Sequence, residues 1–424
     1  MGTKSAYDNA SRITSITDST TSAYTWSSLG YDVLDRLNSA VEGSLNIKWT
    51  YDANGNRLSQ QYSSSSTFNI SSTSNQITST TGSLVRTYAY DAAGNPTSYG
   101  TSVLAYNDRG RLASDTVGGT SSTLVYNALG QMIEYTFGST STVLVYDEAG
   151  HILGEYNPSG TLMREYIWMG DIPVAEIVPS GSSVAVYYIH TDQLNAPRKI
   201  TLPSTNALAW RWDPHPFGEQ TPNQNPSGLG TFINNLRFPG QFYTYESGLN
   251  HNGFRDYDPQ TGKYLESDPI GLGGGVNTYA YAAGNPVSNK DPLGLLVTIQ
   301  ARNPADQAAL QSALDELKTT PAGYAMWQQL DLSPMIYTIG DWKLNADERQ
   351  PMAPRVNVDP NFHPDATTSC GQQPIPTTVA LAHELGHLLR GDNWLDYAKE
   401  WNNVVQYENP ARQQLGLPLR TAYP

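Results

Sequence analysis

The stretch Tyr51-Asp-Ala-Asn-Gly-Asn-Arg-Leu58 is one copy of a short unit that recurs through the first part of the chain. Each copy begins with Tyr-Asp or Tyr-Asn, and most continue to a glycine or arginine and then to an apolar residue. The copies begin at Tyr7, Tyr31, Tyr51, Tyr90, Tyr106, Tyr126 and Tyr146. The later copies recur about every twenty residues, and a fixed period of this size indicates repeated supersecondary units.

Each unit is predicted to form a β-hairpin. Alternating stretches such as 123–126 and 143–146 suit strands, and the Asn or Asp with its following glycine supplies the turn. Stacked hairpins would form one long, curling sheet in which each unit buries its aromatic side chain against its neighbour. Repetition alone is consistent with an adhesive stalk as well as with a shell.

The composition of the 424 residues limits the possible functions. This length predicts two or three domains. A formal charge of −14 argues against nucleic acid as a partner, because phosphate binding needs a basic surface. Cys370 is the only cysteine, which excludes a disulfide framework and a thiolate metal site. No apolar run reaches the length of a membrane span, and the N-terminus lacks the apolar stretch of a secretory signal.

From about residue 166 the period fades and a different set of strings appears. These strings are Tyr187–Asp192, Phe238–Gln241, Gly253–Pro259, Gly262–Gly271, Asn277–Tyr281 and Asp291–Leu295. Together with the Tyr-Asp units, they resemble an Rhs/YD-repeat polymorphic toxin over residues 1–295. The resemblance implies repeats over 1–165, a repeat-associated core over 166–295, and a hollow β-shell that encloses a toxin domain.

The resemblance also implies that the chain cuts itself between Leu295 and Leu296, through Asp268 and Asp291. Two carboxylates can share one proton, so that one activates water while the other protonates the leaving group. From the residues alone, both positions also fit ordinary Asp-Pro turns. Lys263 stands where the family usually has arginine; lysine lacks bidentate geometry, which puts efficient cutting in question.

Residues 296–424 differ in composition and contain His383-Glu-Leu-Gly-His387. Histidines four apart on a helix lie on one face and can meet at one metal ion. Glu384 can then act as general base on a metal-bound water, which is the H-E-x-x-H arrangement of zinc metallopeptidases. The alternative is an ordinary amphipathic helix with two exposed histidines.

The rest of this segment predicts a small α+β, zincin-like domain. Helices are expected at 376–390 and 394–408, and short strands at 335–339 and 355–358. The whole chain is therefore expected to be mainly β, with this small domain at its end.

A catalytic zinc ion (Zn2+) needs a third protein ligand. No histidine follows His387, so a carboxylate is required, and the candidates are Asp392, Asp396, Glu400 and Glu408. Glu408 is favoured by its spacing on a following helix, and Asp396 is the main alternative.

The last strings of the chain, from Tyr407 to Tyr423, resemble the C-terminal signature of bacterial effector metallopeptidases, which strengthens the choice of Glu408. The resemblance implies that Tyr423 stabilises an oxyanion. Arg412 is expected either to hold the substrate or the ligand carboxylate, or to serve ordinary packing.

The predicted function is a bacterial polymorphic toxin whose shell encloses and releases a zinc endopeptidase that cleaves proteins of a target cell. We expect an immunity protein and a secretion or translocation apparatus as partners, with delivery from the producer's cytoplasm by a specialised export system. Two alternatives stay open: a structural or adhesive repeat protein with an inactive C-terminal module, and a zinc amidase with a non-protein substrate. Residues 1–295 are too few for a closed shell, so we expect a piece of a longer protein.

Overall fold

Each Tyr-Asp unit forms the turn between two antiparallel strands. In the turn after Tyr51, Asp52 Oδ1 accepts the backbone N–H groups of Asn54 at 2.9 Å and Asn56 at 2.8 Å. The backbone N–H of Gly55 donates to the carbonyl of Asp52 at 3.2 Å, and Gly55 has a φ of +83°. Because side chains other than glycine avoid this conformation, the glycine of the unit belongs to the turn itself.

In five units the tyrosine hydroxyl bonds the preceding hairpin, through Tyr31, Tyr51, Tyr90, Tyr126 and Tyr146. Tyr51 donates its hydroxyl hydrogen to the carbonyl of Leu37 at 2.8 Å, and Tyr126 donates to the carbonyl of Leu112 at the same distance. The guanidinium of Arg36 lies 4.8 Å from the centre of the Tyr51 ring. These units are therefore joined by a hydrogen bond and, where the preceding turn ends in arginine, by a cation–π contact.

The structure is a computed structural model, and it divides the chain into two compact units, Met1–Pro269 with Gly275–Leu295, and Ile270–Gly274 with Leu296–Pro424. In the first unit it describes residues 3–10, 12–19, 25–269 and 276–295. In the second it describes residues 271, 299–300, 312–313, 316–317, 320, 322, 338–340, 355–357, 365–368, 371–374, 376–382 and 404–421.

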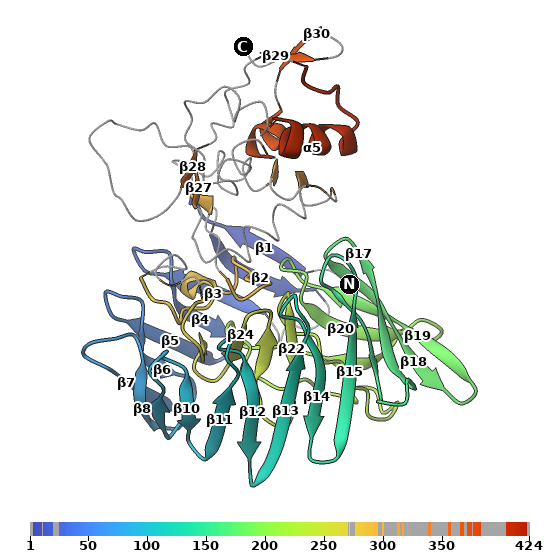
Figure 1. Ribbon diagram of the computed structural model, residues 1–424. Coiled ribbons are helices and arrows are strands. Elements are labelled where there is room, and N and C mark those ends of the chain that lie inside the picture. Colours follow the sequence, from blue (N-terminus) through green and yellow to red (C-terminus); the bar gives the residue numbers. More distant parts are fainter. Residues whose placement is uncertain are drawn as a thin grey trace. The chain divides into compact units, whose positions relative to one another are not determined.

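The first unit is built on one antiparallel meander, which has 21 strands within the described residues. Its strands are β1 (Thr3–Tyr7), β2 (Ile13–Asp18), β3 (Trp26–Tyr31), β4 (Leu37–Glu42), β5 (Leu45–Tyr51), β6 (Arg57–Gln61), β7 (Ser65–Ile70), β8 (Ile77–Gly82), β9 (Arg86–Tyr90), β10 (Pro96–Tyr99), β11 (Ser102–Tyr106), β12 (Leu112–Val117), β13 (Thr120–Tyr126), β14 (Met132–Phe137), β15 (Thr140–Tyr146), β16 (Ile152–Tyr156), β17 (Leu162–Met169), β18 (Ile172–Ser180), β19 (Ser183–Thr191), β20 (Pro197–Leu202) and β21 (Ala207–Arg211). Each strand pairs with the next one along the chain, as the succession of colours in Figure 1 shows. The prediction of a mainly β chain made of Tyr-Asp hairpins is confirmed.

The meander continues to β21, beyond the point near residue 166 where the sequence period fades. The strands β18 and β19 pair over six residues from Ala175 to Ser180, without a Tyr-Asp string between them. Strand pairing here follows the alternation of the side chains and the turn at Gly181, whose φ is +61°.

The meander curls until its first strands meet its last ones. Asp18 on β2 forms ion pairs with Lys199 on β20, at 2.7 Å, and with Arg211 on β21, at 3.2 Å. All three side chains are less than a tenth exposed. This seam joins strands that are far apart in the sequence.

The segment after β21 lies against the inner face of the sheet. It contains the four-stranded sheet of β22 (Gln241–Tyr243), β23 (Asn250–Asn252), β24 (Arg255–Asp258) and β25 (Lys263–Tyr264), and the 3-10 turn η3 (Ala282–Gly284). Arg86 on β9 forms an ion pair with Asp258 at 2.6 Å, and Gly94 accepts the hydroxyl of Tyr279 at 2.8 Å. The hydrophobic core therefore lies between the meander and this segment, and it includes Trp210, Trp212, Tyr257 and Tyr281.

The described residues of the second unit contain both helix and sheet. Strands β26 (Ile299–Gln300), β27 (Thr338–Gly340) and β28 (Arg355–Asn357) pair in parallel, whereas β29 (Asp365–Thr368) and β30 (Gly371–Pro374) form an antiparallel pair. Residues 377–382 are helical, and a π-helix η4 (Val404–Glu408) leads into α5 (Asn409–Gln414). Among the residues that the structure describes, none belongs to a helix both long and apolar enough to span a bilayer.

Candidate functional site

The two aspartates predicted for self-cleavage come together in the first unit. Both contact Arg255 on β24: its Nη2 atom lies 2.9 Å from Oδ2 of Asp268 and 3.3 Å from Oδ2 of Asp291. All three side chains are about 1% exposed. One guanidinium nitrogen thus lies between two carboxylates that are shielded from water, which strengthens the electrostatic interaction among the three groups.

The same cluster holds the loop that ends at the predicted cleavage site. Oδ1 of Asp291 accepts the backbone N–H of Leu295 at 3.0 Å, and Arg255 Nε donates to the carbonyl of Gly294. Asn252 on β23 donates its side-chain N–H to the backbone carbonyl of Asp291 at 2.9 Å. The residue on the N-terminal side of the predicted cut is therefore fixed by a side chain of the aspartate pair. Leu296 lies outside the described residues.

Two glycines allow this loop to approach the inner segment closely. A Cβ atom added at Gly240 would lie 1.7 Å from the carbonyl oxygen of Pro292, and one at Gly253 would lie 2.2 Å from that of Leu293. Both glycines also have positive φ values, +81° and +54°. A larger residue at either position would push the loop at 291–295 away from Arg255.

Tyr264 on β25 completes the cluster. Its hydroxyl donates to Oδ2 of Asp291 at 2.8 Å and accepts a hydrogen bond from Asn252 at 2.6 Å. Arg255 stacks on its ring, with Cζ 3.7 Å from the ring centre. Burial, together with the charge of Asp291, raises the pKa of Tyr264 well above 10. The phenol therefore stays protonated and acts as a fixed donor to Asp291.

Sequence reasoning identified the aspartates but missed Arg255, Tyr264 and Asn252. All three belong to or adjoin strings that distinguish this part of the sequence, but no spacing rule connects them to the aspartates. Their link is tertiary: Asn252 faces Arg255 in the β23–β24 pair, and both reach the loop at 291–295.

Lys263, which stands where the family usually has arginine, contacts other partners than the aspartate pair. Its ammonium donates to the side-chain oxygen of Asn56 at 2.8 Å and to the backbone carbonyl of Asn75 at 3.0 Å. Burial lowers its pKa to about 7. The cation at the aspartate pair is Arg255, whereas Lys263 anchors β25 to the repeats.

Of the residues predicted for the zinc site, the structure describes Glu408. Its carboxylate is buried and accepts hydrogen bonds from Arg412 Nε at 2.8 Å and from Arg420 Nη1 at 3.1 Å. Orientation by hydrogen-bonding neighbours is also seen in metal-ligating carboxylates. Arg412 thus contacts this carboxylate within a buried cluster, an arrangement that fits ordinary packing as well as holding a ligand.

The remaining predicted residues of the metal site, His383, Glu384, His387, Asp396 and Tyr423, lie outside the described residues. Within the part of the chain that the structure describes, no three His, Cys, Asp or Glu side chains gather in a way that could hold a metal ion. The metal site therefore stays a prediction from the sequence.

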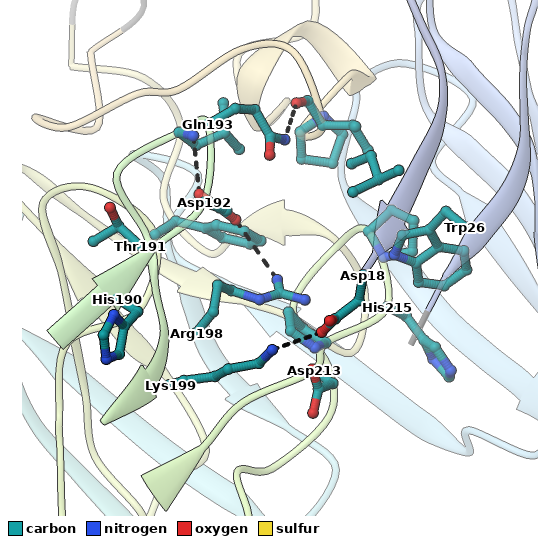
Figure 2. A pocket seen from close by; sticks show the side chains of 17 residues that line it. Asp18, Trp26, His190, Thr191, Asp192, Gln193, Arg198, Lys199, Asp213 and His215 are labelled. Atoms are coloured by element: carbon teal, nitrogen blue, oxygen red, sulfur yellow. Dashed lines mark hydrogen bonds and ion pairs between the residues drawn. The ribbon is translucent and has the colours of Figure 1, made fainter. Parts of the chain in front are cut away.

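A cavity of about 90 Å³ lies at the seam of the meander, and Figure 2 shows the residues that line it. Four of its charged side chains form two pairs, Lys199 with Asp18 and Arg198 with Asp192, the latter at 3.6 Å. Gln193 donates to the carbonyl of Val287 at 3.1 Å. These contacts tie the seam together, and we assign the cavity to the closure of the sheet.

Comparison with protein families agrees with this architecture. The family model of the Teneurin YD-shell matches residues 2–287. The Tc holotoxin pore of Photorhabdus luminescens, a solved structure, aligns over 70% of this chain and 21% of its own, at 16% identity and a TM-score of 0.32.

Several curated toxins are similar to parts of the chain. The Toxin protein Tse5 of Pseudomonas aeruginosa is 35% identical over 125 residues, which cover 30% of this chain and 9% of that protein. The Double-stranded DNA deaminase toxin A of Burkholderia cenocepacia is 34% identical over 139 residues, covering 32% and 10%. The Probable deoxyribonuclease RhsB of Dickeya dadantii is 52% identical over 60 residues, covering 14% and 4%. The chain thus spans a tenth or less of the length of these relatives.

Proposed function

The chain belongs to the Teneurin YD-shell family, and we propose that it is a bacterial toxin that cuts itself after Leu295 and so releases a zinc-dependent peptidase. The first half of this proposal rests on the buried group of Asp268, Arg255 and Asp291. In this group the carboxylate of Asp291 accepts the backbone N–H of Leu295. The names of the toxin relatives support the assignment to a toxin.

Self-cleavage is a hydrolysis of the peptide bond between Leu295 and Leu296. Water adds to the carbonyl carbon of Leu295, the C–N bond breaks, and the nitrogen of Leu296 leaves as an amine after taking up a proton. One carboxylate of the pair Asp268 and Asp291 removes a proton from the water, and the other delivers the proton to the leaving nitrogen. Asp291 also positions the bond through its contact with Leu295.

The structure suggests how Arg255 supports this reaction. Its three hydrogen-bonding nitrogens contact both carboxylates and the carbonyls of Gly294 and Thr278. A planar guanidinium fixes several acceptors at once, so the cleavage loop and the two acids keep one arrangement.

The test of self-cleavage is direct. Purified full-length chain should consist of two polypeptides, with a new N-terminus at Leu296, whereas the Asp291→Asn variant should stay intact. Glu148→Gln, in an exposed turn of the repeats, is the matched control that removes one carboxylate elsewhere. Intact-mass analysis that shows one uncut native chain would contradict the proposal.

For the released domain, we propose that His383, His387 and Glu408 hold a zinc ion, with Glu384 as general base. When bound, zinc would supply a Lewis acid and an activated water. Glu408 is chosen over Asp396 for its spacing in the sequence, and its carboxylate is buried and oriented by two arginines. Metal analysis decides between them: Glu408→Ala should lose zinc and Asp396→Ala should keep it. The opposite pattern would move the third ligand to Asp396.

The names of two relatives, a DNA deaminase and a deoxyribonuclease, favour a second candidate, a domain that acts on DNA. Residues 296–424 contain nine Lys and Arg against fourteen Asp and Glu, a balance that disfavours binding to phosphates. Expression of the native chain and of Glu384→Ala in the cytosol of a target cell separates the two. A peptidase predicts that Glu384→Ala abolishes toxicity and that target DNA stays unmodified; damaged DNA with both chains would favour the second candidate.

A further inference from the structure

Arginine closes three of the Tyr-Asp or Tyr-Asn turns, at the same position of the unit, but its contacts differ among them. In the first two turns the guanidinium binds the aspartate of its own turn: Arg12 contacts Asp8 at 2.7 Å, and Arg36 contacts Asp32 at 2.6 Å. In the third turn, which begins at Tyr106, the corresponding arginine is Arg111.

The third turn has Asn107 in place of the aspartate. Its side-chain oxygen accepts the backbone N–H groups of Arg109 at 2.9 Å and of Arg111 at 3.1 Å, as the aspartates do in the other turns. The amide carries no charge, however, so the turn offers the guanidinium no local ion pair. This turn thus has the same backbone hydrogen bonds as the aspartate turns, but its arginine can contact other groups.

The released guanidinium reaches from the repeats to the inner segment. Arg111 Nη1 donates to the carbonyl of Gly130 at 2.7 Å, and Nη2 donates to the carbonyl of Gly253. The guanidinium lies between the rings of Tyr126, at 4.3 Å, and Phe254, at 5.3 Å. Arg111 is 8% exposed, so these contacts are largely shielded from solvent.

Gly253 lies in the turn between β23 and β24, and this turn contacts the loop at 291–295. The next residue, Phe254, donates its backbone N–H to the carbonyl of Leu293 at 2.7 Å. The residues on either side of Gly253 and Phe254 are Asn252 and Arg255, both of which hold the loop at 291–295. Arg111 therefore donates a hydrogen bond to the backbone at the centre of this turn.

We propose that Arg111 is a positioning residue for self-cleavage: a side chain of the repeats that holds the 252–255 turn, and through it Arg255 and the loop ending at Leu295. This inference rests on the proposed self-cleavage. It assigns a role to the asparagine of the third turn as well, because an aspartate at 107 would recapture the guanidinium as Asp8 and Asp32 do in their turns.

The decisive variant is Asn107→Asp, which adds an ion pair to the turn and withdraws Arg111 from Gly253. We measure the rate at which newly translated full-length chain is cut, in cell-free synthesis, and the thermal unfolding midpoint of the same protein. Cutting should slow by about tenfold or more, the effect of losing a charge-assisted contact, while the midpoint stays equal or rises. Asn157→Asp adds the same charge to a turn without arginine and should cut at the native rate.

Two further variants distinguish positioning from general stability. Arg111→Gln should cut as slowly as Asn107→Asp, and Arg111→Lys, which keeps a cationic donor, should recover most of the rate. Asn107→Ser keeps an uncharged acceptor and should cut normally. Native rates in both Asn107→Asp and Arg111→Gln, or slowing that merely follows a lower midpoint, would overturn the proposal.

Hydrogen exchange separates this inference from the proposed function. The amide of Phe254, bonded to Leu293, should exchange about tenfold faster or more in Asn107→Asp than in the native chain. If the native chain is never cut, the proposed self-cleavage is wrong. The exchange rate of the Phe254 amide then tests by itself whether Arg111 holds the 252–255 turn. Equal exchange of Phe254 in the two proteins would refute the role of Arg111 whether or not cutting occurs.

Discussion

Replacement of Glu176 by glutamine should remove a large pH dependence of folding stability. Glu176 on β18 is fully buried, and one arginine, Arg164, lies between it and Glu155. Arg164 Nη1 bonds Glu155 directly, whereas its Nε lies 3.3 Å from Glu176 Oε1 without hydrogen-bond geometry. The guanidinium of Arg164 is thus hydrogen-bonded to Glu155, whereas Glu176 accepts its hydrogen bond from Asn234, at 2.8 Å.

Burial raises the pKa of Glu176 from 4.5 to about 8, against the opposing effects of Arg164 and Asn234. Below pH 4.5 the carboxyl is protonated in both the folded and the unfolded chain, and its titration has no effect on stability. Between 4.5 and about 8 only the unfolded chain loses the proton, so stability falls as the pH rises. At 1.36 kcal/mol for each pKa unit, the full loss above pH 8 is about 5 kcal/mol.

Urea unfolding of the full chain, followed by tryptophan fluorescence, measures this loss. The free energies of unfolding of the native chain and Glu176→Gln should differ little near pH 5 and diverge by about 5 kcal/mol near pH 9, in favour of the variant. Glu134→Gln, on strand β14 of the same meander, removes a carboxylate that is only partly buried and should follow the native chain. Parallel stability curves for the native chain and Glu176→Gln between these pH values would refute the reasoning.

Three further outcomes follow from the contacts. Tyr126→Phe loses the hydrogen bond to Leu112 and should lower the free energy of unfolding by about 1 kcal/mol in urea titrations; no change would mean that the hydroxyl is replaced by water without cost. Arg255→Met leaves two buried carboxylates without their cation, so intact-mass analysis should show no cutting and the free energy of unfolding should fall by about 3–5 kcal/mol; a stable, cut variant would contradict this. His387→Ala should lose most of its zinc in metal analysis while Glu384→Gln keeps it, and equal zinc in both would exclude the proposed ligand set.

The sequence predicts those parts of the structure that depend on interactions between residues close together in the chain. The turn at Asp52 is readable because the side chain, the N–H groups it accepts and the required glycine lie within five residues. Asp268 and Asp291 were paired through family resemblance, and no local pattern connects them. Arg255 was missed because its partners are brought to it by strand pairing and by the close packing at Gly253.

The order of strands in the meander has a consequence for synthesis at the ribosome. Because every strand pairs with its neighbour in the sequence, each new hairpin closes only a short loop and can add to the strands already made. Between strands of the meander, the ion pairs of Asp18 with Lys199 and Arg211 instead join positions separated by almost two hundred residues. The sheet can therefore assemble strand by strand, from its N-terminal end, as the chain emerges. The loss of chain entropy on closing the seam falls in one late step, after β20 and β21 have left the exit tunnel.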